Sequence, residues 1–212
     1  VIVLLSFVHE KGLSSSSAAR LASGAVPAMR PAFSGRFKLF LLTMGVFTLG
    51  NSSDFFIVLR AQNLGVNVLN ITLMLVLFNL TYAIISVPAG MLSDRLGRRR
   101  VIVIGWTVYA LVYLGFALSA SVWHMWVLFA AYGIYYGIVE GAAKAFVADL
   151  VPAERRGTAY GYFQGVVGMM LLPASVLAGW LWDKINPATP FYFGAGLAFL
   201  AMLGLLFLLK EK

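Results

Sequence analysis

The sequence contains no cysteine among its 212 residues, and it contains only two histidines, His9 and His124. Without cysteine the chain has no disulfide, no thiol nucleophile and no thiolate ligand for a metal. The two histidines lie far apart in the sequence at loop positions, and no metal-ligand spacing relates them. We therefore expect neither a metal site nor a cofactor.

Charged residues are also scarce, at 11% of the chain against 61% hydrophobic residues. In a soluble domain about a quarter of the residues are charged, and such a domain cannot bury this much apolar surface. Windows of about 20 apolar residues recur along the sequence, which is the length that crosses a bilayer core as a helix. The composition predicts an all-α, polytopic membrane helix bundle surrounded by the lipid bilayer.

The net charge of +8 is compatible in principle with a nucleic-acid partner. However, the basic residues lie in short loops at helix ends rather than along one soluble face, so we expect no nucleic acid. The sequence also lacks a Ser/His/Asp set and a nucleotide-binding glycine loop at usable spacing. These absences argue against an enzyme.

Six spanning segments are predicted, at about residues 38–59, 70–92, 101–120, 126–148, 158–180 and 190–209. Together they form a transmembrane domain over residues 38–212. Residues 1–8 are apolar but too short to span, and we interpret them as the end of a truncated preceding transmembrane helix. Residues 9–37 are rich in Ser, Ala, Gly and Pro, which is typical of a linker.

Lysine and arginine are divided unequally between the two sides of the predicted bundle. The linker, the loop at 93–100, the segment after the fourth span and the C-terminus hold thirteen of them, whereas the other side holds only Arg60 and Lys184. By the positive-inside rule, the linker, the arginine-rich loop and the C-terminus are expected to be cytoplasmic, in a cell membrane.

The ends of two spans are similar in sequence. The second span ends in GMLSD at residues 90–94, and the fifth ends in GWLWD at residues 179–183. Each segment closes the middle helix of a three-helix unit, and the two lie on opposite predicted faces of the membrane. This is the pattern expected of a 3+3 inverted repeat.

Polar residues inside the predicted spans indicate which helices line a polar pathway, because such residues are costly in lipid. Those of the fourth span are spaced four residues apart and therefore lie on one helix face. The second span carries Tyr82 beside Asn79, whereas the third and sixth carry no charge and can face lipid. The candidate cavity and coupling residues are Asn51, Asp54, Asn79, Tyr132, Tyr136, Glu140, Lys144 and Gln164.

Glycines also repeat every four residues in two spans. They occupy positions 133, 137 and 141 in the fourth span and positions 157, 161 and 165 in the fifth. Small residues at this spacing let membrane helices approach closely. Tight packing is the simpler interpretation, and a sliding contact that repacks between two states is the alternative.

The segment GMLSDRLGRRR, residues 90–100, follows the pattern Gly-x-x-x-Asp-Arg-x-Gly-Arg-Arg. With six spans and a basic linker before them, the chain resembles the C-terminal half of a major facilitator superfamily transporter, which has this pattern in a cytoplasmic loop. The stretch ADLVPAERRGTAYG, residues 148–161, resembles the family's segment between its tenth and eleventh helices. The positions that match the loop pattern are Gly90, Asp94, Arg95, Gly97, Arg98 and Arg99.

The resemblance implies a fold of twelve helices in two halves. Residues 1–8 would then be the end of the sixth helix, residues 9–37 the central linker, and the missing N-terminal half a partner of this chain. Asp94 would face the positive N-terminal end of a helix in the other half, and Arg98 would pair with Asp149. These residues would form a cytoplasmic latch; the alternative is that the arginines only orient the loop.

The leading hypothesis is a secondary active transporter that moves a small-molecule substrate by alternating access, as symporter or antiporter. The sequence has no ATP-binding motif, so an ion gradient, most simply of protons, is the expected energy source. The alternative is a non-transporting membrane sensor or assembly module on the same fold. Intramembrane charges favour transport, because they are costly unless used.

Two acids compete as the proton carrier. Glu140 lies four residues before Lys144, a spacing at which an ion pair forms on a helix. Glu140 can alternate between this lysine and a proton, or the lysine can meet an anionic substrate. Asp54 in the first span is the rival carrier.

Overall fold

The computed structural model describes residues 33–208. The expectations for residues 1–8, for residues 9–32 of the linker and for the C-terminal lysines lie outside the described residues. Within them, helix α3 already begins at Gly35, three residues before the predicted start of the first span.

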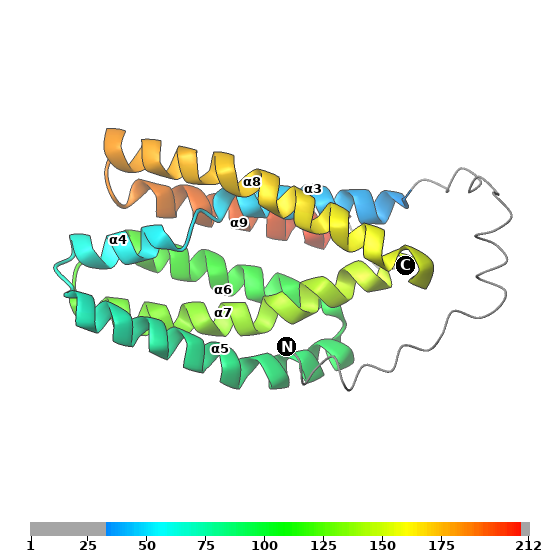
Figure 1. The fold of residues 1–212 in the computed structure, drawn as a ribbon, viewed down its shortest axis with the longest axis horizontal. Coiled ribbons are helices and arrows are strands. Elements are labelled where there is room, and N and C mark those ends of the chain that lie inside the picture. The colour runs from blue at the N-terminus through cyan, green and yellow to red at the C-terminus, as the bar shows by residue number, and fades with distance from the viewer. Residues whose placement is uncertain (1–32, 209–212) are drawn as a thin grey trace, which may run out of the picture. The chain divides into compact units, whose positions relative to one another are not determined.

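The described chain is helical, with short connections (Figure 1). Taken together, α3 and α4 make one span, and the six resulting segments are long and apolar enough to cross a membrane. The prediction of an all-α bundle with six spans is therefore confirmed. In chain order the elements are α3 (Gly35–Gly50), α4 (Phe55–Asn63), α5 (Val68–Leu96), α6 (Arg98–Leu118), α7 (Val122–Asp149), the 3₁₀ turn η1 (Ala153–Arg155), α8 (Arg156–Lys184) and α9 (Thr189–Leu208).

The first span differs from the prediction because it is broken. The backbone amide of Asn51 ends α3 by donating to the carbonyls of Phe47 and Thr48, and α4 begins only at Phe55. The intervening Asn-Ser-Ser-Asp run explains the break, since these side chains compete with the helical backbone and favour caps and turns. The apolar window across residues 38–59 obscured this local signal.

The two pieces of the first span pack on different neighbours. At the end of α3, a Cβ on Gly50 would lie 2.7 Å from the Cβ of Leu197, so the two backbones cross closely there. In α4, the buried Arg60 donates to the carbonyls that end α6, including Nε to Phe116 at 3.2 Å and Nη2 to Ser119 at 3.0 Å. A cation suits these carbonyls, because a helix C-terminus carries partial negative charge.

Helix α6 lies at the centre of the core, where it packs against α7 and α9. One of its faces is fully buried and includes Trp106, which stacks on Phe47 of α3 with ring centroids 4.7 Å apart. Its other face, with Leu111 and Leu118, is exposed. The expectation that this span can face lipid therefore holds for one side only, because its aromatic side fills the core.

Helices α5 and α8 are the least covered spans, with 11% of their most apolar windows buried, compared with 39% to 50% for the others. Two of the regularly spaced glycines explain how α5 meets α7. A Cβ on Gly133 would lie 2.4 Å from the carbonyl oxygen of Phe78, and one on Gly137 would lie 3.0 Å from Ile85. Tight packing therefore explains these two positions. The other four, at 141, 157, 161 and 165, face open space.

One residue separates α5 from α6. Gly97 has φ +90° and ψ 135°, in the left-handed region that glycine adopts without steric cost. This sharp reversal joins the end of α5 directly to the arginines that begin α6. We call this part of the bundle, where α5 and α7 end and α6 begins, the arginine-rich end.

Candidate functional site

A cavity of about 280 Å³ lies between α3, α7 and α8. Its wall is largely apolar and aromatic, with a few polar groups. Of the predicted pathway residues, the cavity is lined by Asn51, Tyr136, Glu140, Lys144 and Gln164. The aromatic lining comes from Phe47, Tyr135, Tyr136 and Phe163. Such a mixture is typical of small-molecule sites, in which apolar walls hold the ligand and a few polar groups orient it.

An ion pair lies on this wall. Lys144 Nζ is 2.7 Å from Glu140 Oε1, and both side chains are partly exposed. The hydroxyl of Tyr82 on α5 donates to the other carboxylate oxygen of Glu140. The Glu140 carboxylate therefore has two partners: the Lys144 ammonium group on its own helix and the neutral Tyr82 hydroxyl on α5.

Tyr82, rather than Asn79, is the α5 residue that reaches this site. The amide of Asn79 donates to the carbonyl of Leu75 in its own helix at 2.8 Å, and the side chain is exposed. Such a local bond to the preceding turn is common for asparagine in a helix. The sequence signal for Tyr82 was a second polar residue three positions after Asn79.

Asp54 lies at the break, where it precedes the first residue of α4. Its carboxylate accepts hydrogen bonds from two tyrosines of α7, Tyr132 at 2.6 Å and Tyr136 at 3.2 Å. No ion pair joins Asp54 to a lysine or arginine among residues 33–208. Among the described residues, its carboxylate is therefore stabilised by the hydroxyl dipoles of the two tyrosines and by the N-terminus of α4.

Asn51 makes its contacts with α6. Its Oδ1 lies 3.2 Å from the hydroxyl of Tyr109 and 3.4 Å from that of Tyr113, and the Tyr109 hydroxyl is also 3.3 Å from the carbonyl of Gly50. Sequence reasoning missed both tyrosines as partners of the break. The signal available was their spacing of four residues in a span without charge, since a buried tyrosine hydroxyl needs a partner.

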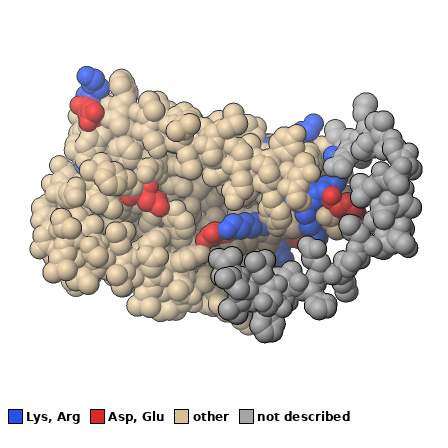
Figure 2. Space-filling model, in the orientation of Figure 1, with Lys and Arg blue, Asp and Glu red and all other residues tan. Residues whose placement is uncertain are grey.

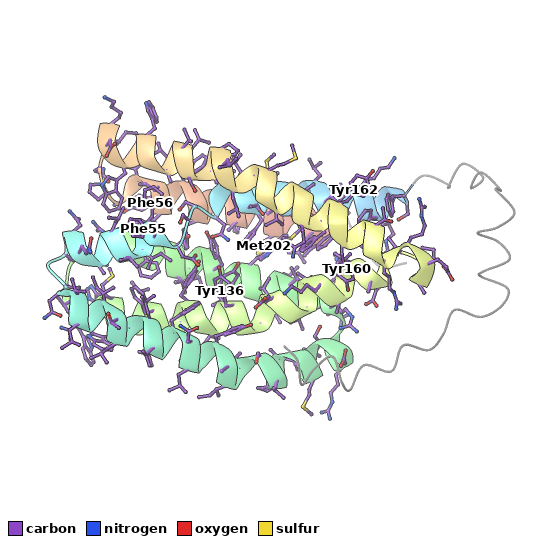
Figure 3. All side chains as sticks on the ribbon, in the orientation of Figure 1. Phe55, Phe56, Tyr136, Tyr160, Tyr162 and Met202 are labelled. Atoms are coloured by element: carbon purple, nitrogen blue, oxygen red, sulfur yellow. The ribbon has the colours of Figure 1, made fainter. Side chains whose placement is uncertain are left out.

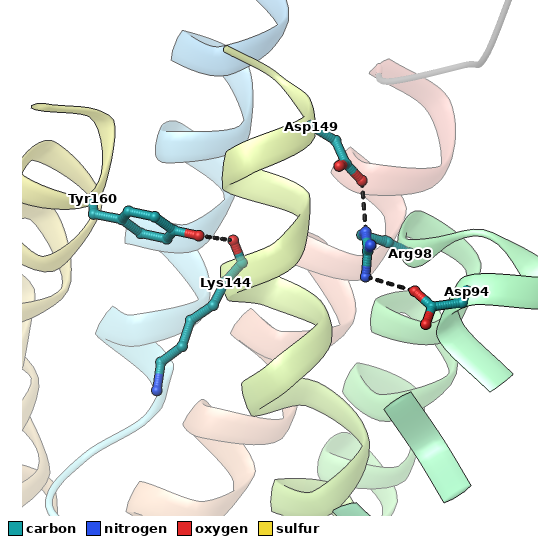
Figure 4. A network of polar contacts seen from close by, with 5 residues as sticks. All are labelled: Asp94, Arg98, Lys144, Asp149 and Tyr160. Carbon is teal, nitrogen blue, oxygen red and sulfur yellow. Dashed lines mark hydrogen bonds and ion pairs between the residues drawn. The ribbon is translucent and has the colours of Figure 1, made fainter. Parts of the chain in front are cut away.

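The residues predicted to form the latch lie together at the arginine-rich end (Figure 4). Arg98 Nε is 2.6 Å from Asp149 Oδ2, and Arg98 Nη1 is 3.2 Å from Asp94 Oδ1. The structure thus joins the end of α5, the start of α6 and the end of α7 through one guanidinium. A second cavity of about 430 Å³ opens beside these groups and is also lined by Arg36.

The other residues of the loop pattern lie differently. Arg99 donates from Nε to the carbonyl of Leu205 at 2.9 Å and also donates to Leu206, so it caps the end of α9. Gly90 faces open space, and Arg95 is exposed. Three functions are therefore distributed over one short loop: the turn at Gly97, the ion pairs of Arg98 and the helix cap by Arg99.

Charged side chains are unevenly distributed over the visible face. Figure 2 shows several of them together at the arginine-rich end, on the right of the view, with a few in the tan middle of the bundle and others at the opposite end. Figure 3 shows Tyr136 among the helices of that middle region. The charged groups of the cavity wall are thus isolated within an apolar surface.

Comparison with known proteins identifies the family of the chain. Residues 39–212 match the family model described as Major Facilitator Superfamily. An uncharacterized MFS-type transporter of Methanocaldococcus jannaschii is 44% identical over 177 residues, which cover 81% of this chain and 44% of that protein. The class B tetracycline resistance protein of Escherichia coli is 28% identical over 138 residues, covering 65% of this chain and 34% of the relative.

A solved structure shares the fold. The crystal structure of the peptide transporter POT in complex with sulfate superimposes with a TM-score of 0.59 at 17% identity, and it covers 84% of this chain and 38% of that one. The chain spans less than half the length of these curated relatives. With its six apolar helices and the family match over most of its length, the chain belongs to the Major Facilitator Superfamily and is a multi-pass membrane protein of a transporter family.

Proposed function

We propose that the chain is the C-terminal half of a secondary active transporter, which moves a small solute across the cell membrane by alternating access. The observation that carries the proposal is the Glu140–Lys144 pair on the wall of the cavity. Charged groups inside spanning helices are costly and are typical of substrate and ion pathways. The poorly covered α5 and α8 supply the faces against which a preceding six-helix half would pack.

The cavity favours a small amphipathic solute. Aromatic rings from α3, α7 and α8 offer flat apolar contacts, while Asn51, Gln164 and the ion pair offer polar ones. Relatives of this chain are named for resistance to tetracycline and, at 24% identity over 142 residues, to quinolones in Staphylococcus aureus. We propose a substrate that combines an aromatic or apolar body with a polar or charged group.

The proposed orientation places the arginine-rich end in the cytoplasm, because the basic residues of the linker, of the loop at 93–100 and of the C-terminus then lie inside. In this orientation the Asp94–Arg98–Asp149 cluster is a cytoplasmic latch that stabilises one of two access states. Its support is that one guanidinium holds three helix ends together.

Coupling to protons is proposed to occur at Glu140, with Asp54 as the rival carrier. If a proton neutralises Glu140, the carboxylate no longer attracts Lys144, and the lysine becomes available to an anionic group of the substrate. Asp54 differs because its charge has no cationic partner among the described residues, so protonation there removes an uncompensated charge. The two carriers are separable by experiment.

The test uses the complete transporter in vesicles with an imposed proton gradient. Glu140→Gln is expected to abolish uphill transport while solute exchange, which needs no net proton movement, continues. Asp54→Asn is the rival variant, and Glu154→Gln, at an exposed position of η1, is the matched control. Full uphill transport by Glu140→Gln combined with loss in Asp54→Asn would assign the proton to Asp54. Absence of transport by the unmodified protein, with all candidate ligands and gradients, would favour the sensor or assembly module.

A further inference from the structure

Helix α8 meets α7 through a hydrogen bond near the arginine-rich end. Along its length α8 packs mainly on α3, and it makes fewer contacts with α7. Tyr160, one turn into α8, donates its hydroxyl to the backbone carbonyl of Lys144 at 3.0 Å (Figure 4). This contact is separate from the ion pairs of Arg98, which lie on another side of α7.

The acceptor of this bond has a second partner. The Lys144 carbonyl lies inside α7, which continues to Asp149, so it already has a helical partner in the amide four residues on. Removal of the tyrosine hydroxyl would therefore leave no buried carbonyl without a hydrogen bond. Folding of α7 does not require the Tyr160 bond, and its effect is on the position of α8 relative to α7.

The bond lies at the edge of the cavity. Lys144 lines the cavity, and so do Phe163 and Gln164, which follow Tyr160 by about one helical turn on α8. On both sides of Tyr160, a Cβ on Gly157 or Gly161 would meet nothing within 4 Å. No other described residue packs on α8 at these two glycines, so the tyrosine is the contact that ties this part of α8 to α7.

We propose that Tyr160 is a positioning residue that holds α8 against α7 and so closes the arginine-rich end of the cavity. Breaking its bond to Lys144 lets α8 move away and opens a path to the cavity from that end. A role of this contact in transport rests on the proposed function of the cavity. The Tyr160 bond would then be a second contact that holds α7, in addition to the ion pair of Arg98 with Asp149. A neutral hydrogen bond suits a tether that must open and close repeatedly, because it is easily exchanged for one to water.

The sequence supplies a matched control two residues away. Tyr162 lies on a different side of α8, where its ring meets Phe33 edge to face with centroids 5.5 Å apart, and more than half of the residue is exposed (Figure 3). Tyr160→Phe and Tyr162→Phe remove the same atom from the same helix. Only the first removes the bond to α7.

The experiment measures access to the cavity rather than activity. Because the described chain has no cysteine, Val167→Cys on the cavity wall provides a single reporter in the complete transporter, with any cysteine elsewhere replaced. A membrane-impermeant maleimide is added to inside-out vesicles, which expose the arginine-rich end. We expect Tyr160→Phe to raise the labelling rate about fivefold, the change in population expected when one ordinary hydrogen bond is lost. Tyr162→Phe should leave the rate unchanged.

Equal labelling in both variants and in the parent would overturn the proposal, and so would an equal increase in both. In transport assays, Tyr160→Phe should change the maximal rate while the apparent substrate affinity stays the same; a change in affinity alone counts against a positioning role. Labelling does not depend on transport, so its result stands even if the unmodified protein moves no solute. In that case the proposed function is wrong, and the labelling rates still decide whether Tyr160 holds α8 against α7.

Discussion

Two clusters of charged side chains in this molecule contain the same kind of acid–base pair but differ in the third residue that joins it. In each, an acid precedes a base by four residues: Glu140 and Lys144 on α7, and Asp94 and Arg98 across the turn between α5 and α6. The cavity pair adds a neutral hydroxyl as its third member, whereas the cluster at the arginine-rich end adds a second acid, Asp149.

The difference in the third member changes the charge of each cluster. Glu140 and Lys144 cancel, so the cavity cluster has no net charge while both partners are ionised. The other cluster has two carboxylates around one guanidinium and is left with one negative charge. A neutral pair can be opened by a single proton or by a charged solute, and a negative cluster is suited to a positive helix end on a facing domain.

The largest effect in this comparison is expected from removal of the cavity base. Lys144→Met leaves Glu140 with only the hydroxyl of Tyr82, an uncompensated charge inside a span. We expect transport to fall by about tenfold or more and thermal stability to decrease, as measured by uptake and by melting in detergent.

Lys144→Met combined with Glu140→Gln should recover part of the stability. The coupling energy should be on the order of 1 kcal/mol, since partial exposure of both groups weakens the pair. Additive losses in the double variant would show that the two residues do not interact.

A smaller effect is expected from the cluster at the arginine-rich end. Arg98→Ala removes both ion pairs and leaves Asp94 and Asp149 facing each other. Because both pairs are partly exposed, we expect the transport rate to fall by about three- to tenfold with little change in apparent affinity. Arg95→Ala, at an exposed position in the same loop, is the control. A large loss of affinity in Arg98→Ala would contradict a role in setting the access state.

The smallest effect should come from the neutral third member. Tyr82→Phe keeps the Glu140–Lys144 pair and removes one hydroxyl from α5. We expect a two- to fivefold change in the transport rate, about what one hydrogen bond accounts for. The comparison is with Tyr162→Phe, which is remote from the cavity pair. Identical transport by the two variants would show that Tyr82 does not contribute to the site.

The helical period explains which parts of both clusters could be predicted. Residues four apart share a helix face, so Glu140 and Lys144 were paired from sequence alone. Asp149 was assigned to Arg98 from the resemblance to the family. Tyr82 was visible as a polar residue, but which α7 residue it meets depends on how closely α5 approaches at Gly133 and Gly137.

The break in the first span was harder to predict for a different reason. Its Asn-Ser-Ser-Asp run carries a local signal, yet hydropathy averages over a window longer than the run. The tyrosines of α6 that meet Asn51 were assigned to a lipid-facing span because an uncharged helix shows no preferred face in composition. Only the packing of α6 on α3, α7 and α9 decides which side is buried.

The break at residues 51–54 divides the first span into two short helices that are joined by a non-helical segment. Successive helical hydrogen bonds stiffen a helix along its axis, and that series is interrupted between Asn51 and Phe55. Helix α3 packs closely on α9 at Gly50, whereas α4 is held at the end of α6 by Arg60. No helical hydrogen bond runs through the break, so a change in the direction of α4 would not have to break the helical bonds of α3. Asp54 lies at the point where the two directions meet.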